Sequence, residues 1–181
     1  ASVFYSLIED YIVPIVDEDI PRKFMPNTEP THAKRFVNIN KAMQTGFELY
    51  WNYHITYDLK FSSDFSYTYA KNKEYEEPLP QITPFTTNLA LKYERSKYWL
   101  NLNSRIVAAQ TRISDSFKET ASEAFNTLDF SVGYTPTKNL TIGASILNIF
   151  DTAYYEHLNF SYQNSDILSG RIYEPGRNFT L

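Results

Sequence analysis

The chain has 181 residues, enough for one ordinary domain, and its 17 Lys and Arg against 21 Asp and Glu give a formal net charge of −4. No overall positive charge is therefore available to attract nucleic acid. The chain has no Cys, which excludes disulfides, thiolate metal sites and a Cys nucleophile. Mean hydropathy is −0.42, and no apolar run approaches the roughly 20 residues of a membrane-spanning helix. That excludes helical spans but leaves a membrane β-barrel open, because barrel strands alternate and average out polar.

Apolar and polar residues alternate along most of the chain, which is the pattern of strands with one oily and one wet face. The clearest segment is LKFSSDFSYTYA (residues 59–70), where Leu59, Phe61, Phe65 and Tyr67 share a face. The alternation predicts about eight strands. They lie near residues 2–12, 35–53, 57–70, 85–94, 97–112, 127–135, 139–149 and 171–181.

The predicted connections alternate between short and long. Short ones fall near 53–57, 94–97 and 135–139, and long ones near 13–34, 71–84, 113–126 and 150–170. Outer-membrane barrels have short periplasmic turns and long outside loops, whereas a soluble sandwich or barrel has no reason to keep this order. The order therefore favours an all-β fold, an antiparallel transmembrane β-barrel, over the soluble alternative.

Aromatic residues gather near the predicted strand ends, which indicates the interfacial girdles of a barrel. Ordinary strand propensity of Tyr and Phe is the alternative explanation. The polar face suits either the filled interior of an eight-stranded barrel or a wider lumen, and composition does not separate the two. The residues expected on that face include Lys60, Asp64, Asn88, Lys92, Asn101, Asn103, Arg105 and Asp129.

The sequence predicts no catalytic, cofactor-binding or metal site. No G-x-S-x-G or H-E-x-x-H is present, and the three His are widely spaced. Glu76 and Glu77 are interpreted as a solvated loop pair. The three adjacent acids at 17–19 lack the alternate spacing and the Gly of an EF-hand, which disfavours a cation site there. The chain is therefore not expected to be an enzyme.

Four segments resemble the signatures of one family. LNIFDTAYYEHLN (Leu147–Asn159) is similar to the penultimate strand of TonB-dependent outer-membrane receptors, in which N-[LI]-F-D precedes Tyr. RIYEPGRNF (Arg171–Phe179) is similar to their last strand, in which P-G-R precedes an aromatic residue. NINKAMQTGFEL (Asn38–Leu49) and EEPLPQITPFTTNLALKYE (Glu76–Glu94) resemble two further strand segments. All four occur in the family's order at about its spacing.

The resemblance implies that residues 1–181 are the C-terminal part of a barrel of about 22 strands, without the plug domain that fills its lumen. Such receptors lie in the outer membrane of Gram-negative bacteria and import a ferric siderophore, haem, a metal ion or cobalamin, energised by the TonB complex. The implied partners are outer-membrane lipid, the remaining strands and plug, the TonB complex through that plug, and a small nutrient ligand. The family's last strand normally runs on to an aromatic terminus, so a tail is expected beyond Leu181.

The signature residues are interpreted as structural. Asn and Asp side chains hydrogen-bond nearby backbone and so end a strand, Pro cannot donate to a ladder, and Gly permits a bulge or turn. These residues are Asn148, Phe150, Asp151, Pro175, Gly176 and Arg177.

The last long loop contains the candidate substrate contacts. Tyr154, Tyr155 and Tyr162 offer stacking surfaces. His157 is a further candidate, although membership of the strand-exit signature explains it more simply.

Two alternatives remain. A self-contained eight-stranded outer-membrane barrel with a structural or adhesion role has the same strand count, and it requires the strands near 2–12 and 171–181 to pair. An outer-membrane esterase or protease is disfavoured because no nucleophile constellation is present.

Overall fold

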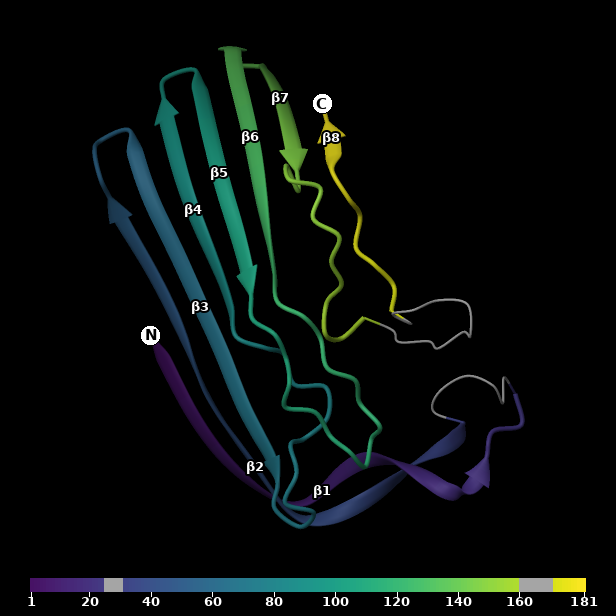
Figure 1. The fold of residues 1–181 in the computed structure, drawn as a ribbon. Coiled ribbons are helices and arrows are strands. Elements are labelled where there is room, and N and C mark those ends of the chain that lie inside the picture. The colour runs from purple at the N-terminus through teal and green to yellow at the C-terminus, as the bar shows by residue number, and fades with distance from the viewer. Residues whose placement is uncertain (25–30, 160–170) are drawn as a thin grey trace.

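The computed structural model describes residues 1–24, 31–159 and 171–181. These residues form one antiparallel sheet of eight strands, each paired with its neighbours in chain order (Figure 1). The strands are β1 (Ser2–Pro21), β2 (His32–His54), β3 (Leu59–Asn72), β4 (Thr86–Arg95), β5 (Tyr98–Val107), β6 (Phe125–Thr137), β7 (Leu140–Leu147) and β8 (Asn178–Thr180). Nowhere in the described ranges is there a helix long and apolar enough to cross a membrane. The predicted all-β antiparallel fold is confirmed.

The sheet is open. Residues 2–16 of β1 pair with β2, and residues 178–180 pair with β7. Within the described segments the first and last strands form no ladder with each other and remain the two edges. The closed eight-stranded barrel, which requires that ladder, is therefore wrong for this structure.

Across β2 to β8 the strand register gathers apolar side chains on one face of the sheet. A continuous row of paired residues crosses β2 to β8 and contains only large apolar and aromatic side chains. Its members are Tyr53, Phe61, Leu91, Leu102, Phe130, Ile146 and Phe179. The adjacent row faces the other way and is wholly polar. Its members are His54, Lys60, Lys92, Asn101, Ser131, Ser145 and Thr180. A slip of one residue in any strand would exchange the faces, so this pattern specifies the register.

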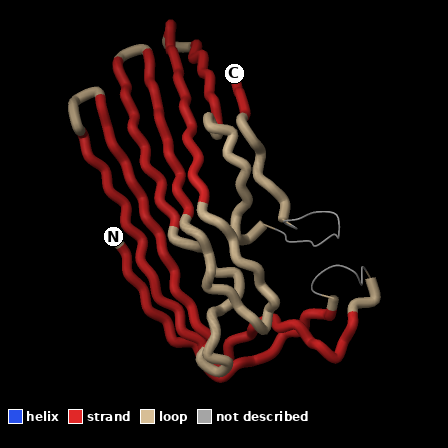
Figure 2. Tube along the Cα trace, in the orientation of Figure 1, coloured by secondary structure: helices blue, strands red, loops and turns tan. Residues whose placement is uncertain are grey.

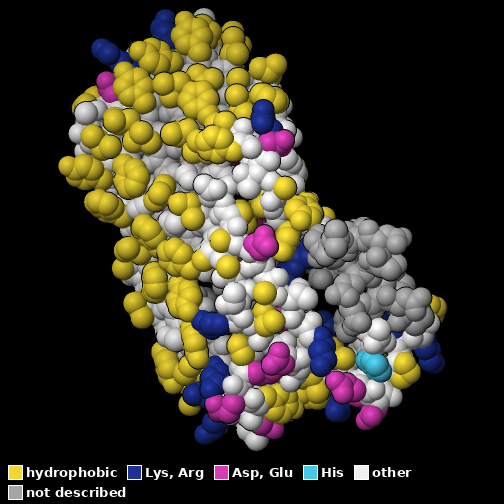
Figure 3. All heavy atoms as spheres, in the orientation of Figure 1, with side chains coloured by type: hydrophobic (Ala, Val, Ile, Leu, Met, Phe, Trp, Pro, Cys, Tyr) yellow, Lys and Arg dark blue, Asp and Glu magenta, His cyan; other side chains and the backbone are white. Residues whose placement is uncertain are grey.

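The apolar face is largely uncovered. Tyr53 is 54% exposed, Phe179 68% and Leu102 39%. Figure 3 shows hydrophobic side chains spread over the strands, with Lys, Arg, Asp and Glu more numerous toward the end where the long loops lie and a few at the short-turn end. A contiguous apolar surface of this extent is typical of a lipid-facing sheet rather than a water-facing one.

Aromatic rings border the apolar face at the short-turn end. Trp51 and Tyr53 lie 5.9 Å apart between ring centroids, and Tyr93 and Tyr98 lie 6.2 Å apart. Trp99 differs from its neighbours in the predicted girdle because it belongs to the opposite, polar face. A Cβ on Gly133 would lie 2.4 Å from the Trp99 ring, so the indole fills the space that this glycine leaves.

The predicted long loop at 13–34 is wrong, because both flanking strands continue through it. β1 runs to Pro21 and β2 begins at His32. β1 is an edge strand here and has a neighbour on one side only. Its prolines therefore do not remove the ladder hydrogen bonds to a second neighbour that an inner strand would need. Two of the three acids at 17–19 form ion pairs, since Asp17 lies 2.8 Å from Arg35 and Glu18 lies 3.3 Å from Lys118.

The extended β1–β2 ribbon bends across the long-loop end of the other strands (Figure 1). At the bend Asp10 has a left-handed φ of 53° and no partner in the ladder. The opposing Asn40 N–H instead donates to the Glu74 carboxylate at 2.6 Å. A small apolar core underlies this region. Its buried members are Val13, Ile39, Ala42, Ala70 and Leu79.

Two other strand boundaries differ from expectation. β5 ends at Val107 instead of near 112, and the last strand is only Asn178–Thr180 instead of 171–181. Before β8 the chain stays beside the segment after β7 through single bonds, such as Glu174 N–H to the Tyr154 carbonyl at 2.9 Å. Pro175 has no N–H to donate, so a regular ladder is interrupted there.

Candidate functional site: the polar loop cluster

The described parts of the long connections lie at the same end of the sheet (Figure 2). These connections are residues 22–31, 73–85, 108–124 and 148–177, while residues 55–58, 96–97 and 138–139 form short turns at the other end. The predicted alternation of short and long connections is confirmed, although the first long one is shorter than expected. The polar loop cluster is the network that joins the long connections: Glu77, Gln81, Gln110, Ser114, Glu119, Thr120, Ser122, His157 and Arg171.

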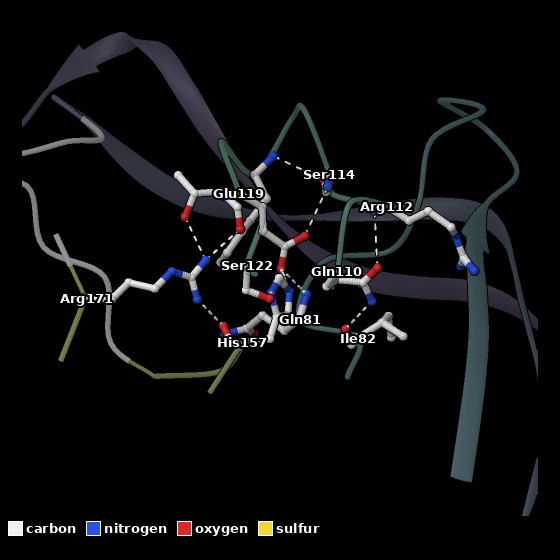
Figure 4. Close-up of polar contacts among 11 residues, drawn as sticks. Gln81, Ile82, Gln110, Arg112, Ser114, Glu119, Ser122, His157 and Arg171 are labelled. Carbon is white, nitrogen blue, oxygen red and sulfur yellow. Dashed lines mark hydrogen bonds and ion pairs between the residues drawn. The ribbon is translucent and has the colours of Figure 1, made fainter. Parts of the chain in front are cut away.

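Glu119 is the hub of the polar loop cluster (Figure 4). Its carboxylate accepts the Gln81 N–H at 2.7 Å, the Ser114 N–H at 3.0 Å and the His157 Nε2 at 3.2 Å. Burial by itself would raise the pKa of Glu119, but the hydrogen bonds from His157, Gln81 and Ser114 outweigh it and hold that pKa below the ordinary value. The group is therefore a carboxylate at neutral pH and links three segments.

His157 joins the last loop to the β5–β6 loop. Its Nδ1 lies 3.0 Å from the Ser122 Oγ, and its side chain is 1% exposed. Nε2 faces the Glu119 carboxylate and donates to it, while Nδ1 contacts the Ser122 hydroxyl. Both ring nitrogens are thus engaged within the protein.

Arg171 connects the segment before β8 to the polar loop cluster. Its guanidinium donates to the His157 carbonyl, and at 2.6 and 2.7 Å to the carbonyl and hydroxyl oxygens of Thr120. Arg171 is 5% exposed, and this burial lowers the pKa of its guanidinium below the ordinary value. Figure 4 shows the side chain reaching into the cluster from the chain's last described segment.

Glu77 joins the β3–β4 loop to the β5–β6 loop. It accepts from the Ser114 hydroxyl at 3.0 Å and from the backbone N–H groups of Asp115 and Ser116 at 3.0 and 3.1 Å. The Ser116 carbonyl in turn accepts the Val16 N–H of the β1–β2 ribbon at 2.8 Å. The interpretation of Glu77 as merely solvated is therefore wrong, because its carboxylate caps a turn of the neighbouring loop.

The Ser122, His157 and Glu119 side chains contain the residue types of a hydrolytic triad, but their placement is structural. Ser122 is 5% exposed and its hydroxyl is committed to His157. A nucleophile must reach its substrate, and this one lies inside a packed loop junction. Within the described residues no group of three or more His, Asp or Glu side chains has the arrangement of a metal site.

The predicted substrate contacts lie beside this cluster. Tyr154 stacks on Phe125 with ring centroids 4.3 Å apart, and Tyr155 meets Tyr173 edge-on at 5.3 Å. His157 is buried, while Tyr154 and Tyr155 are half-buried. Tyr162 lies outside the described residues. Ligand contact by these four side chains stays a prediction.

The two family signatures meet in space. Asn148 and Asp151 have φ angles of 51° and 55°, and the Asp151 N–H closes a tight turn onto the Asn148 carbonyl at 2.9 Å. The Asn148 side chain bonds both backbone groups of Thr152 at 2.9 Å. The Asp151 Oδ1 accepts the Arg177 N–H at 2.7 Å, and a Cβ on Gly176 would lie 2.7 Å from that same oxygen.

Asn and Asp tolerate the left-handed conformation better than other residues with a side chain, which suits them to this turn. Phe150, between them, is 67% exposed. Pro175 precedes the glycine that makes room for the Asp151 carboxylate. The interpretation of the signatures as strand-ending devices stays a prediction.

The polar face of the sheet carries side-chain bonds between strands. Asn88 donates to Asp64 at 2.8 Å. Arg105 forms a two-point ion pair with Glu156 of the last loop, with Nη2 to Oε2 at 3.2 Å. These residues line the face opposite the lipid-facing rows.

Sequence reasoning missed most of the loop cluster. Glu119 and Ser122 fit no local motif, and their partners lie far away along the chain. Arg171 carried a signal, since it opens the segment that resembles the last-strand signature.

Comparison with known proteins identifies the barrel. The family model for the TonB dependent receptor-like β-barrel matches residues 1–149. The iron-regulated outer membrane virulence protein of Vibrio cholerae is 30% identical over 121 residues, which are 64% of this chain and 19% of that protein. The chain thus spans about a fifth of the length of that curated relative.

Solved structures give the same result. The copper transporter OprC superposes with a TM-score of 0.83 at 26% identity, over 98% of this chain and 26% of that one. A mutant of the ferric enterobactin receptor PfeA from Pseudomonas aeruginosa superposes with a TM-score of 0.69 at 20% identity, over 98% of this chain and 27% of that one. The chain belongs to the TonB-dependent receptor family and forms part of its Gram-negative outer-membrane β-barrel.

Proposed function

We propose that residues 1–181 form the C-terminal part of the barrel wall of an outer-membrane receptor that imports a scarce nutrient. The observation that carries this proposal is the open sheet whose long loops are tied into one polar cluster. Two unpaired strand edges in lipid need further strands, because edge N–H and C=O groups find no partner in hydrocarbon. The remaining barrel strands and a plug in the lumen are therefore the proposed partners, with outer-membrane lipid around them.

The proposed orientation puts the long loops outside the cell and the short turns in the periplasm. The polar loop cluster then fixes the shape of part of the outer ligand-binding surface. Tyr154 and Tyr155 present rings beside it, and we propose them as stacking contacts for the nutrient. His157, which is buried, is proposed to position the loop that carries these two tyrosines. Tyr162 is proposed as a further contact with the nutrient.

The proposed nutrient is a ferric siderophore. The curated relative is iron-regulated by name, and several structural relatives are named as ferric siderophore receptors. A copper ion is the second candidate because OprC, named a copper transporter, superposes with the TM-score of 0.83. Haem and cobalamin are further members of the family's substrate range. The proposed energy source is the TonB complex, acting through the plug, and the proposed role is transport rather than catalysis.

Uptake by cells tests this proposal. The full-length receptor is expressed in a strain without its own siderophore receptors, and labelled ferric siderophores, haem, cobalamin and copper are supplied with and without functional TonB. Binding to cells is expected in both strains, and uptake only where TonB functions. Equal uptake in both strains would show a passive channel and refute the energised importer.

The loop contacts are tested in the same assay. Tyr154→Ala and Tyr155→Ala are expected to raise the half-saturation concentration for binding by about tenfold, because each stacking contact contributes about 1 kcal/mol or more. Tyr57→Ala is the matched control, since Tyr57 is fully exposed in a short turn at the other end of the sheet. Unchanged binding by both loop variants would remove these residues from the site.

A further inference from the structure

Two lysines face each other directly across neighbouring strands on the polar face of the sheet. Lys60 of β3 is the ladder partner of Lys92 of β4, and on its other side it is the partner of His54 of β2. We define the basic row as His54, Lys60 and Lys92. Side chains directly opposite each other in a ladder have Cβ atoms about 5 Å apart, and like charges at that spacing destabilise the pairing. The sheet therefore keeps a local repulsion at this row.

The basic row lies at the short-turn end of the sheet. β2 ends at His54 and β3 begins at Leu59, with a short turn between them. In Figure 1 this turn and the β4–β5 turn lie at the end of the sheet opposite the long loops. The polar face is the inner face of a barrel wall. In the proposed orientation the basic row therefore lines the lumen near its periplasmic mouth.

Lys60 is the lysine of the basic row that lacks a counter-charge. On the polar face of β3, β4 and β5 the cations are Lys60, Lys92 and Arg105. Lys92 lies 2.6 Å from Glu94, and Arg105 forms its ion pair with Glu156. Among the residues that the structure describes, no carboxylate forms an ion pair with Lys60.

The carboxylates farther along the same face are already engaged. Asp64 accepts from the Asn88 amide at 2.8 Å, and Asp129 accepts the Asn148 N–H at 2.8 Å. From Lys60 to Asp64 the strand advances about 13 Å. Because that distance exceeds the Debye length at physiological ionic strength, the attraction between these two charges is largely screened. The charge of Lys60 is therefore not balanced within the sheet.

An anion is the ligand that fits the basic row. Lysine side chains that line a pore favour anions, and a wall with one sign of charge raises the local concentration of the opposite charge. Asn101 of β5 is the ladder partner of Lys92 and adds neutral amide N–H donors to the same row. A free metal cation would be repelled here.

We propose that the basic row is a transit subsite for a nutrient complex of negative charge, such as a ferric siderophore with deprotonated catecholate groups. The inference rests on the proposed import function and names the charge class of the cargo. The complex contacts Lys60 after it leaves the loops and before it enters the periplasm. A transit subsite must attract its cargo and also let it leave, and a half-buried ammonium meets both needs because solvent screens its charge.

The test measures uptake by cells that express the full-length receptor, with ferric enterobactin as the anionic probe and a neutral ferric trishydroxamate beside it. Lys60→Gln is expected to lower the TonB-dependent uptake rate of ferric enterobactin about fivefold, the loss that follows from one charge contact in water. Half-saturation of binding at the cell surface should not change, because the loops lie at the other end of the sheet. Lys60→Arg keeps the charge and should keep most of the rate.

Lys97→Gln is the matched control. It removes an exposed lysine from the β4–β5 turn at the same end of the sheet but outside the basic row. Uptake of both probes by this variant should equal uptake by the unchanged receptor.

Charge reversal separates a role in transport from a role in the fold. Lys60→Glu puts a carboxylate directly opposite Lys92, so the strand pairing improves while the subsite repels an anion. The urea midpoint should stay or rise, and uptake of ferric enterobactin should fall further than in Lys60→Gln. A lower midpoint would indicate that Lys60 holds a carboxylate of the plug, and it would overturn the proposal.

Three further results would overturn the proposal. The first is equal uptake of ferric enterobactin by Lys60→Gln and the unchanged receptor. The second is an equal loss of uptake for both probes, or a loss of surface binding, in Lys60→Gln. The third is TonB-dependent uptake of neutral or cationic cargo alone by the unchanged receptor, which leaves the import function intact. Failure of the import function itself is distinct, since the unchanged receptor would then show no dependence on TonB.

Discussion

Glu119 shows how much of the loop architecture depends on single side chains. One carboxylate accepts donors from the β3–β4 loop, its own loop and the last loop. None of these donors has an alternative acceptor supplied by a regular ladder. Loss of such an acceptor leaves buried N–H groups unsatisfied, which costs more than the bond itself contributes.

Glu119→Gln is expected to loosen the polar loop cluster by about 1–3 kcal/mol, because an amide nitrogen replaces one oxygen and opposes an N–H donor. Hydrogen exchange in the full-length receptor should then accelerate at Gln81 or at Ser114, whichever N–H faces the new amide nitrogen, because the two groups bond different oxygens of the carboxylate. Glu123→Gln is the control, since Glu123 is exposed in the same loop. Similar exchange in both variants would contradict the hub role.

The pH dependence of the cluster follows from the pKa of Glu119. That pKa is lower in the folded protein than the ordinary value of 4.5, so the stabilisation is complete above 4.5 and is lost as pH falls through the folded value. Exchange at Gln81 should therefore stay slow from neutral pH down to about 4.5, after correction for intrinsic rates, and rise below it. The Glu119→Gln variant should lack this transition.

Gly176 is expected to tolerate no side chain. Gly176→Ala puts a Cβ 2.7 Å from the Asp151 oxygen that accepts the Arg177 N–H. The Asp151 carboxylate must then move away, and loss of its hydrogen bond to Arg177 is expected to destabilise the protein by about 1–3 kcal/mol. The urea midpoint of the receptor reports this loss. Gly143→Ala is the control, because its Cβ would lie 3.5 Å from the nearest atom, the Val132 carbonyl oxygen. If both alanines shifted the midpoint equally, the turn would not depend on this glycine.

Among the elements, β5 and β6 fit each other closely at one position. The Trp99 indole occupies the space over Gly133, on the polar side of the sheet. Aromatic cover of a strand glycine compensates for the missing side chain. The pair is therefore complementary, and neither residue can be exchanged alone without cost.

A double-mutant cycle tests this complementarity. Gly133→Ala alone should destabilise the receptor, because its Cβ meets the indole at 2.4 Å. In a Trp99→Ala background the same change should stabilise it by about 0.5–1 kcal/mol, since glycine is unfavourable inside a strand. The sign of the effect on the urea midpoint is the readout. An unchanged sign would exclude the proposed contact.

At the scale of the whole molecule, the sheet combines an exposed apolar face with two unpaired edges. Water cannot solvate such a face favourably, and the edges offer templates for other strands. The isolated chain is therefore expected to aggregate in buffer without detergent. Size-exclusion chromatography with light scattering checks this expectation, and a monodisperse monomer would contradict it.

The sequence predicts the sheet far better than it predicts the loops. Alternation places Phe61 and Lys60 on opposite faces with no further information, because the side-chain period of a strand is fixed. The loop partners of Glu119 and Arg171 depend instead on how distant segments meet, and no periodicity encodes that. The sequence also did not predict that β1 continues through Pro14. Proline breaks an inner strand but is tolerated at an edge, and the sequence alone does not show which strand lies at the edge.

The β1–β2 ribbon has a consequence for the order of folding. It reaches the β5–β6 loop through contacts between segments far apart in sequence, from Val16 to Ser116 and from Lys34 to Phe117. Hairpins between neighbouring strands close small loops, whereas these contacts close a very large one and lose more chain entropy before they form. The ribbon should therefore dock only after the ladders between β3 and β6 have formed. The long-loop end of the sheet then acquires its final shape last.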